Sequence, residues 1–95
     1  MTNYQAVIQR LAAEHNVLRR DIVATFAECG MRSARQRVHY YWTGQRCPEP
    51  DAAAVLCVAL DLNARQCLEL YEACGIPTPD PVWQAVQDAA AEGEA

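Results

Sequence analysis

Residues 33–48 of this chain have the sequence SARQRVHYYWTGQRCP. Ser33 is a residue type that commonly caps the N-terminus of a helix, and neither glycine nor proline occurs in the ten residues after it. Gly44 and Pro48 follow, as expected where a helix ends. The stretch therefore predicts a helix from Ser33 to Thr43.

This predicted helix has two chemically different sides. At about 100° per residue, with Val38 facing inward, Tyr41 and Trp42 lie on the same apolar side. Gln36 and Tyr40 then lie at the centre of the opposite side, which carries hydrogen-bond donors and arginines but no carboxylate. Such a helix is suited to the DNA major groove, where base edges are read between two rows of phosphates.

The rest of the chain predicts further helices and no strands, because apolar residues recur three and four positions apart and alternating patterns are missing. Asn63 and Gln66 have the spacing of a capping box and should begin one of these helices. The expected helical ranges are 2–15, 17–29, 52–60, 64–74 and 82–91.

The pattern also predicts which side chains are buried. In helix 17–29 the inward stripe should consist of Leu18, Ile22, Phe26 and Cys29. All residues from 52 to 60 are apolar, so we expect that helix to be surrounded by its neighbours. The inward face of the next helix should hold Cys67, Leu68, Tyr71 and Cys74.

The length of 95 residues allows one main domain. We assign residues 1–76 to it and expect residues 77–95 to form a proline-rich linker followed by a short helix or tail. The expected fold class is all-α.

Net charge is −4, but the two halves of the chain differ. Residues 1–48 hold seven arginines and three acids, whereas residues 49–95 hold one arginine and nine acids. A basic surface in the first half can bind nucleic acid in spite of the whole-chain charge, because exposed charges more than about 10 Å away are screened at ordinary salt.

The five cysteines are an odd number and none belongs to a C-x-x-C pair. We therefore expect reduced, structural cysteines, no metal and no cofactor, which is typical of the cytoplasm. No apolar run approaches the roughly 20 residues that span a bilayer, and the N-terminus does not resemble a secretory signal, so no membrane association is expected.

Residues 33–63 resemble the phage repressor and Cro-like helix-turn-helix family, also called XRE-like. Val38, Tyr41, Gly44, Arg46 and Pro48 follow the aliphatic, aromatic, glycine, basic and proline order of its recognition helix. The likeness extends over residues 3–76. It implies a five-helix lambda-repressor-like domain, here with a short helical extension at the C-terminus.

The resemblance also implies a regulator of transcription that binds specific double-stranded DNA, commonly as a homodimer, and is typical of phages or mobile elements. Gln36 is the expected reader of a base, since glutamine pairs with adenine. Arg19, Arg20 and Arg46 are expected to hold phosphates. The full candidate set is Arg19, Arg20, Arg32, Ser33, Arg35, Gln36, Arg37, His39, Tyr40, Thr43 and Arg46.

A second hypothesis is that the chain is a protein-binding module on the same fold, such as a phage inhibitor of a host system or an antitoxin. Such a module would bind its partner through the acidic half of the chain. Trp83 and Val86 are candidates for dimerisation or for packing within the chain. We expect no enzyme, because no phosphate loop, carboxylate pair or activated nucleophile is present. No small-molecule ligand is expected, since the residues after helix 64–74 are too few to enclose one.

Overall fold

The computed structural model describes the backbone of residues 3–94 and the side chains of residues 4–91. This part of the chain is all-helical, as predicted, with six helices and no strand. The helices are α1 (Asn3–Glu14), α2 (Arg19–Glu28), α3 (Ala34–Thr43), α4 (Pro50–Ala59), α5 (Ala64–Ala73) and α6 (Asp80–Glu94).

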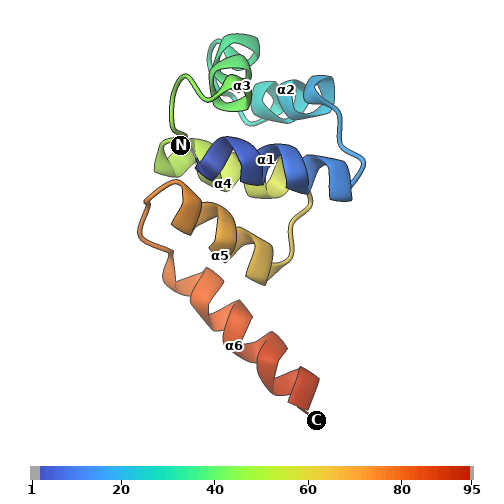
Figure 1. Ribbon diagram of the computed structural model, residues 1–95, viewed down its shortest axis with the longest axis vertical. Helices are drawn as coiled ribbons and strands as arrows, with labels where there is room; N and C mark the ends of the chain where they lie inside the picture. The colour runs from blue at the N-terminus through green and yellow to red at the C-terminus, as the bar shows by residue number, and fades with distance from the viewer. Residues whose placement is uncertain (1–2, 95) are drawn as a thin grey trace.

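The helices are arranged in tiers along the longest axis of the molecule (Figure 1). Helices α1 and α4 lie in the middle, α2 and α3 together form one end, and α5 lies on the opposite side. Helix α6 packs on α5 alone and extends away from the other four helices (Figure 1). The long extent of 43 Å, against 28 and 23 Å in the other directions, reflects this projection.

One apolar core joins α1 to α5. Phe26 of α2 is completely buried and its ring lies 6.2 Å, centroid to centroid, from that of Tyr41 in α3. Since both rings are buried, they fix the position of α3 on α2. The other core side chains are Tyr4, Ile8, Leu11, Ala12, Ile22, Val38, Ala52, Leu56, Leu60 and Leu70.

Four of the helices end in the same backbone motif. After α2, Gly30 has a φ of 79°, its N–H bonds to the carbonyl of Ala27, and the N–H of Met31 bonds to the carbonyl of Phe26. This Schellman arrangement satisfies the last carbonyl groups and directs an apolar residue back onto the core. The equivalent left-handed residues after α1, α4 and α5 are Asn16, Asp61 and Gly75, and the apolar residues that follow them are Val17, Leu62 and Ile76.

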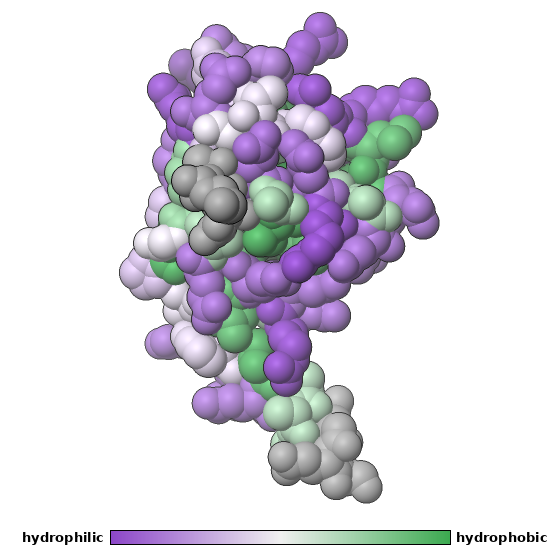
Figure 2. Space-filling model, in the orientation of Figure 1, coloured by the Kyte–Doolittle hydropathy of each residue, from purple (hydrophilic) through white to green (hydrophobic). Residues whose placement is uncertain are grey.

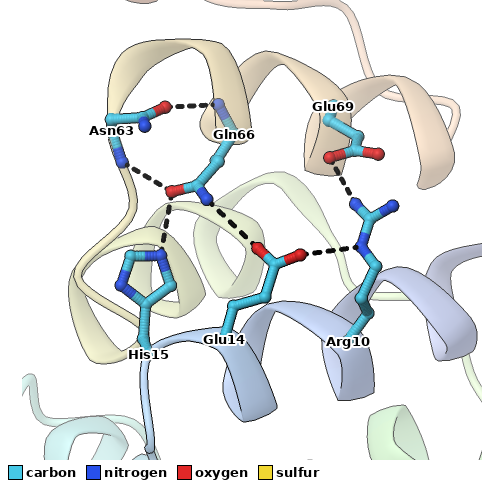
Figure 3. A network of polar contacts seen from close by, with 6 residues as sticks. All are labelled: Arg10, Glu14, His15, Asn63, Gln66 and Glu69. Atoms are coloured by element: carbon cyan, nitrogen blue, oxygen red, sulfur yellow. Dashed lines mark hydrogen bonds and ion pairs between the residues drawn. The ribbon is translucent and has the colours of Figure 1, made fainter.

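A polar network connects α1 with the start of α5 (Figure 3). The predicted capping box is confirmed: the Asn63 side chain accepts from the Gln66 N–H at 2.9 Å, and the Gln66 side chain accepts from the Asn63 N–H at 3.1 Å. The Gln66 amide also contacts His15 at 2.9 Å and donates to Glu14 at 3.4 Å. Ion pairs of Arg10 with Glu14 and Glu69 extend the network.

Several burial predictions were wrong. Leu18 and Cys29 flank α2 rather than belong to it, and both are exposed, Leu18 at 53%. Helix α4 is not surrounded, because Ala54 is exposed and Val58 is 68% exposed on the side that no neighbour covers. The apolar run of this helix thus has one open face, which composition alone cannot show.

The C-terminal elements also differ from the prediction. In α5 the prediction is confirmed for Tyr71, which is buried together with Leu70, whereas Cys67, Leu68 and Cys74 are only half-buried. Helix α6 begins inside the predicted linker at Asp80 and has 15 residues, so it is longer than the expected 82–91. Proline at the first positions of a helix is favourable, which explains the early start. The predicted start of the first helix at residue 2 lies outside the described residues.

None of the described helices is both long enough and apolar enough to cross a membrane.

Candidate nucleic-acid interface

Helix α3 is held by its apolar side, as the sequence predicts. Val38 and Tyr41 are buried, and Trp42 is partly buried against the core. The Gln9 side chain of α1 donates to the carbonyl oxygen of Trp42 at 2.8 Å. Gly44 ends the helix with a φ of 78°, a left-handed conformation that glycine adopts without strain. The helix is therefore fixed at its side and at its C-terminal end.

The opposite side of α3 faces solvent. Gln36 is exposed and its amide nitrogen donates to the hydroxyl oxygen of Tyr40 at 2.8 Å. The Arg46 guanidinium, from the loop after the helix, lies over the Tyr40 ring at 5.4 Å from its centroid. These contacts order the three side chains before any ligand binds, which lowers the entropy cost of binding.

One edge of this face is formed by the start of α2. Arg19 donates to Nδ1 of His39 at 3.2 Å, and its guanidinium lies 5.6 Å from the centroid of the Trp42 ring. Arginine has no acceptor, so His39 Nδ1 must be the unprotonated nitrogen in this contact. Arg19 is thereby held beside α3 with donors still free for an anion.

A shallow hollow of about 780 Å³ lies between the starts of α2 and α3. Its lining consists of Arg19, Ser33, Ala34, Arg35, Gln36 and His39. Two arginines and no carboxylate line it, so its chemistry fits an anion such as a phosphate group. Figure 2 shows that hydrophilic residues cover most of this end of the molecule.

Ser33 was expected to cap α3 with its side chain, and that prediction was wrong. The residue is at the N-cap position, but its φ of 54° and ψ of 43° are left-handed and its hydroxyl makes no capping bond. Capping needs an extended backbone at this position. Within the described residues, the first N–H groups of α3 therefore have no side-chain cap, and they adjoin the hollow.

Arg37 is partly buried and forms an ion pair with an acidic residue. It donates to Glu49 Oε2 at 3.2 Å, and the Tyr41 hydroxyl donates to the same oxygen at 2.7 Å. Burial, followed by the bond to Glu49, raises the pKa of Tyr41 to about 12. Partial burial acts to raise the pKa of Glu49, but the bond from Tyr41 and the charge of Arg37 outweigh it and lower that pKa. The trio connects α3 to the N-cap of α4.

The lowered pKa of Glu49 predicts a pH-dependent effect of Glu49→Gln. A carboxylate whose pKa is lower when folded stabilises the protein above its unfolded pKa, and this contribution is lost as the pH falls through the folded pKa. The variant should be less stable than wild type at pH 7, by no more than about 1 kcal/mol because the side chain is 42% exposed. Urea denaturation at pH 7 and at pH 3 measures the stability difference between the variant and wild type at each pH.

The matched control for this prediction is Glu72→Gln, which removes an exposed carboxylate on α5. Its stability difference from wild type should be small at both pH values. A deficit of Glu49→Gln that persists undiminished at pH 3 would contradict a role for the Glu49 charge.

The remaining candidates fall into two groups. Arg20, Arg32 and Arg35 are exposed and make no side-chain hydrogen bond or ion pair within the described residues. Thr43 is partly buried and donates to the carbonyl of His39 at 2.7 Å, while Gln45 donates to the Thr43 hydroxyl at 3.0 Å. Sequence reasoning missed Glu49 and Gln9 as supporting residues, since each acts across a tertiary contact, and it also missed the contact of Trp42 with Arg19.

The two candidates for dimerisation lie on α6, far from this face (Figure 1). Val86 is partly buried and lines a hollow together with Asn63, Ala64 and Arg65 at the start of α5. Trp83 is 44% exposed. The two residues therefore differ in exposure: Val86 is partly buried, whereas Trp83 has a large exposed surface.

Among the described residues, no group of three or more histidine, cysteine or acidic side chains could hold a metal ion. Comparison of the chain with protein-family models, with curated proteins and with solved structures finds no match.

Proposed function

We propose that this protein binds double-stranded DNA by placing α3 in the major groove, and that it regulates transcription from a specific site. The observation that carries the proposal is the outward face of α3, where Gln36 and Tyr40 are flanked by ordered arginines and no carboxylate of the helix is present. A helix of ten residues is about 15 Å long, and the major groove is about 12 Å wide, so this face can enter it.

In this arrangement α2 and α3 act as a helix-turn-helix. The start of α2 and the loop after α3 bring Arg19 and Arg46 to either side of the recognition helix. Both are supported by aromatic rings and would contact phosphates on opposite walls of the groove. The uncapped N-terminus of α3 and Arg35 offer further donors for a phosphate in the hollow.

Base reading is assigned to Gln36. Its amide nitrogen carries two hydrogens, and only one is needed for the Tyr40 hydroxyl. The other hydrogen and the amide oxygen remain available for N7 and N6 of an adenine. The bond to Tyr40 holds the amide plane in one orientation, which favours one base over the others.

Fluorescence anisotropy at several salt concentrations tests this function. The logarithm of the association constant should fall with the logarithm of salt by about 0.9 per phosphate contacted. On a site selected from random DNA, Gln36→Ala should weaken binding by about 1–3 kcal/mol, but it should have little effect on random DNA. If two copies bind a two-fold site, the half-sites should be about 34–36 Å apart.

Binding that does not respond to salt, or no binding by the folded protein, would contradict the proposal. The acidic half of the chain and the exposed Trp83 would then favour the second hypothesis, in which the chain is a module that binds a basic protein.

A further inference from the structure

Tyr40 lies on the outward side of α3, and its side chain makes two different contacts there. Its hydroxyl oxygen accepts a hydrogen bond from the Gln36 amide nitrogen at 2.8 Å. Its ring lies against the Arg46 guanidinium, whose central carbon is 5.4 Å from the ring centroid. Tyr40 therefore joins the residue to which base reading is assigned with a residue to which a phosphate contact is assigned.

The direction of the bond from Gln36 determines what the Tyr40 hydroxyl can still do. A tyrosine hydroxyl can donate one hydrogen and can also accept. The bond from Gln36 uses the hydroxyl oxygen as an acceptor, and the hydrogen has no acceptor within the described residues. Because the side chain is only partly buried, this hydrogen is available to a ligand, and the ligand must offer an acceptor.

The two polar groups are close enough to reach neighbouring bases. Residues four apart are about 6 Å apart along a helix axis, but helical side chains lean toward the N-terminus. This lean brings the Tyr40 hydroxyl to 2.8 Å from the Gln36 amide. Successive bases of one strand are about 3.4 Å apart along the duplex. When the Gln36 amide lies on the edge of one base, the Tyr40 hydroxyl is therefore within reach of the next.

The contact between the Tyr40 ring and Arg46 depends on how the chain leaves α3. The N–H groups of Gln45 and Arg46 bond to the Tyr40 carbonyl oxygen at 2.9 and 3.3 Å, so the loop turns back over the end of the helix. The Arg46 side chain is exposed and makes no hydrogen bond or ion pair within the described part of the chain. The backbone bonds do not involve the Tyr40 side chain, so substitutions of Tyr40 should leave this loop in place.

We propose that Tyr40 determines specificity at the base next to the adenine read by Gln36, and that its ring positions Arg46 against a phosphate. This inference rests on the proposed function. Guanine, adenine and thymine each present an acceptor on the major-groove edge, whereas cytosine presents only a donor. The free hydrogen of the Tyr40 hydroxyl therefore admits guanine, adenine or thymine at the neighbouring position of that strand and excludes cytosine.

Tyr40→Phe tests the hydroxyl, because it keeps the ring. On the site that wild type selects from random DNA, the variant should bind about tenfold more weakly, and on random DNA its affinity should change by less than about twofold. In sites that the variant itself selects, cytosine should occur next to the adenine as often as the other bases. The salt slope, which is the change in the logarithm of the association constant with the logarithm of salt, should equal that of wild type.

Tyr40→Leu tests the ring, because it removes both the hydroxyl and the surface on which Arg46 rests. It should show the same loss of discrimination, and its salt slope should also fall by about 0.9, the value for one phosphate. Arg46→Gln should lower the slope by the same amount and still exclude cytosine. A residue that only stabilised the fold would not separate these two readouts between the Phe and Leu variants.

Tyr71→Phe is the matched control, because it removes a hydroxyl from a buried tyrosine of α5, a helix without contacts to α3 in the described structure. It should leave the selected sequence and the salt slope unchanged.

Three results would overturn the inference. Cytosine on both sides of the adenine in wild-type sites, or its continued exclusion by Tyr40→Phe, would refute the role of the hydroxyl. An unchanged salt slope in Tyr40→Leu would refute the role of the ring. If wild type itself shows no salt-dependent binding to DNA, the proposed function fails and this inference fails with it, a result that is seen before any variant is compared.

Discussion

Replacement of Arg19, Arg35 and Arg46 together by glutamine is expected to weaken DNA binding on the order of a hundredfold or more at 0.1 M salt. Each is an exposed cation at the edge of α3, and two of them are already ordered by aromatic rings. If each contacts one phosphate, the salt slope should also fall by about 0.9 per arginine removed. Anisotropy titrations of wild type and variant on the same DNA measure both quantities.

The control for charge alone is the substitution Arg65→Gln. Arg65 is exposed and belongs to α5, and this helix lies on the other side of α1 and α4 from α3 (Figure 1). It should leave affinity and salt slope nearly unchanged, because α5 makes no contact with α3 and lies on the other side of the central helices. The melting temperature of the triple variant must stay close to that of wild type for the comparison to hold. Equal losses for Arg65→Gln and for the triple variant would show that binding depends on net charge and not on this face.

Phe26→Ala is expected to remove about 3–5 kcal/mol from the free energy of unfolding. The side chain is fully buried, and its ring packs against that of Tyr41 in α3. The truncation leaves a cavity between α2 and α3, at the contact that orients the proposed recognition helix. The total free energy of unfolding of a small domain is only about 5–15 kcal/mol. The variant should therefore be partly unfolded, and DNA binding should fall in proportion to the unfolded fraction.

Urea denaturation followed by circular dichroism measures the loss for Phe26→Ala, with Leu18→Ala as the control. Leu18 is 53% exposed at the N-cap of α2, so its truncation should change stability by no more than about 0.5 kcal/mol. Similar losses for the two variants would mean that Leu18 is buried in solution and that the packing of α2 differs from the one described.

The orientation of α3 could be predicted because it depends on local periodicity. The inward position of Val38 requires Tyr41 to be buried and Gln36 to face solvent, and the structure confirms both. The same reasoning failed at Leu18, because helix α2 begins at Arg19, two residues after the predicted start at residue 17, and the Leu18 side chain precedes the buried stripe. Periodicity locates a face well, but it does not locate the end of a helix.

The support of the candidate site could not be predicted in the same way. Arg37 meets Glu49 across a turn, and Arg19 meets His39 and Trp42 across two helices. None of these pairs has the three- or four-residue spacing of a helix face, so no pattern in the sequence indicates them.

The amino-acid sequence by itself determined that this chain is helical, which residues of α3 point inward, that Gly44 ends α3, and that Asn63 caps α5. These are properties of neighbouring residues, governed by backbone conformation and by the period of 3.6. Only the tertiary structure decided which arginines are paired or free, that one face of α4 stays exposed, and that α6 projects from α5. Those outcomes depend on which surfaces meet after the helices have formed, and therefore on the packing of the whole core.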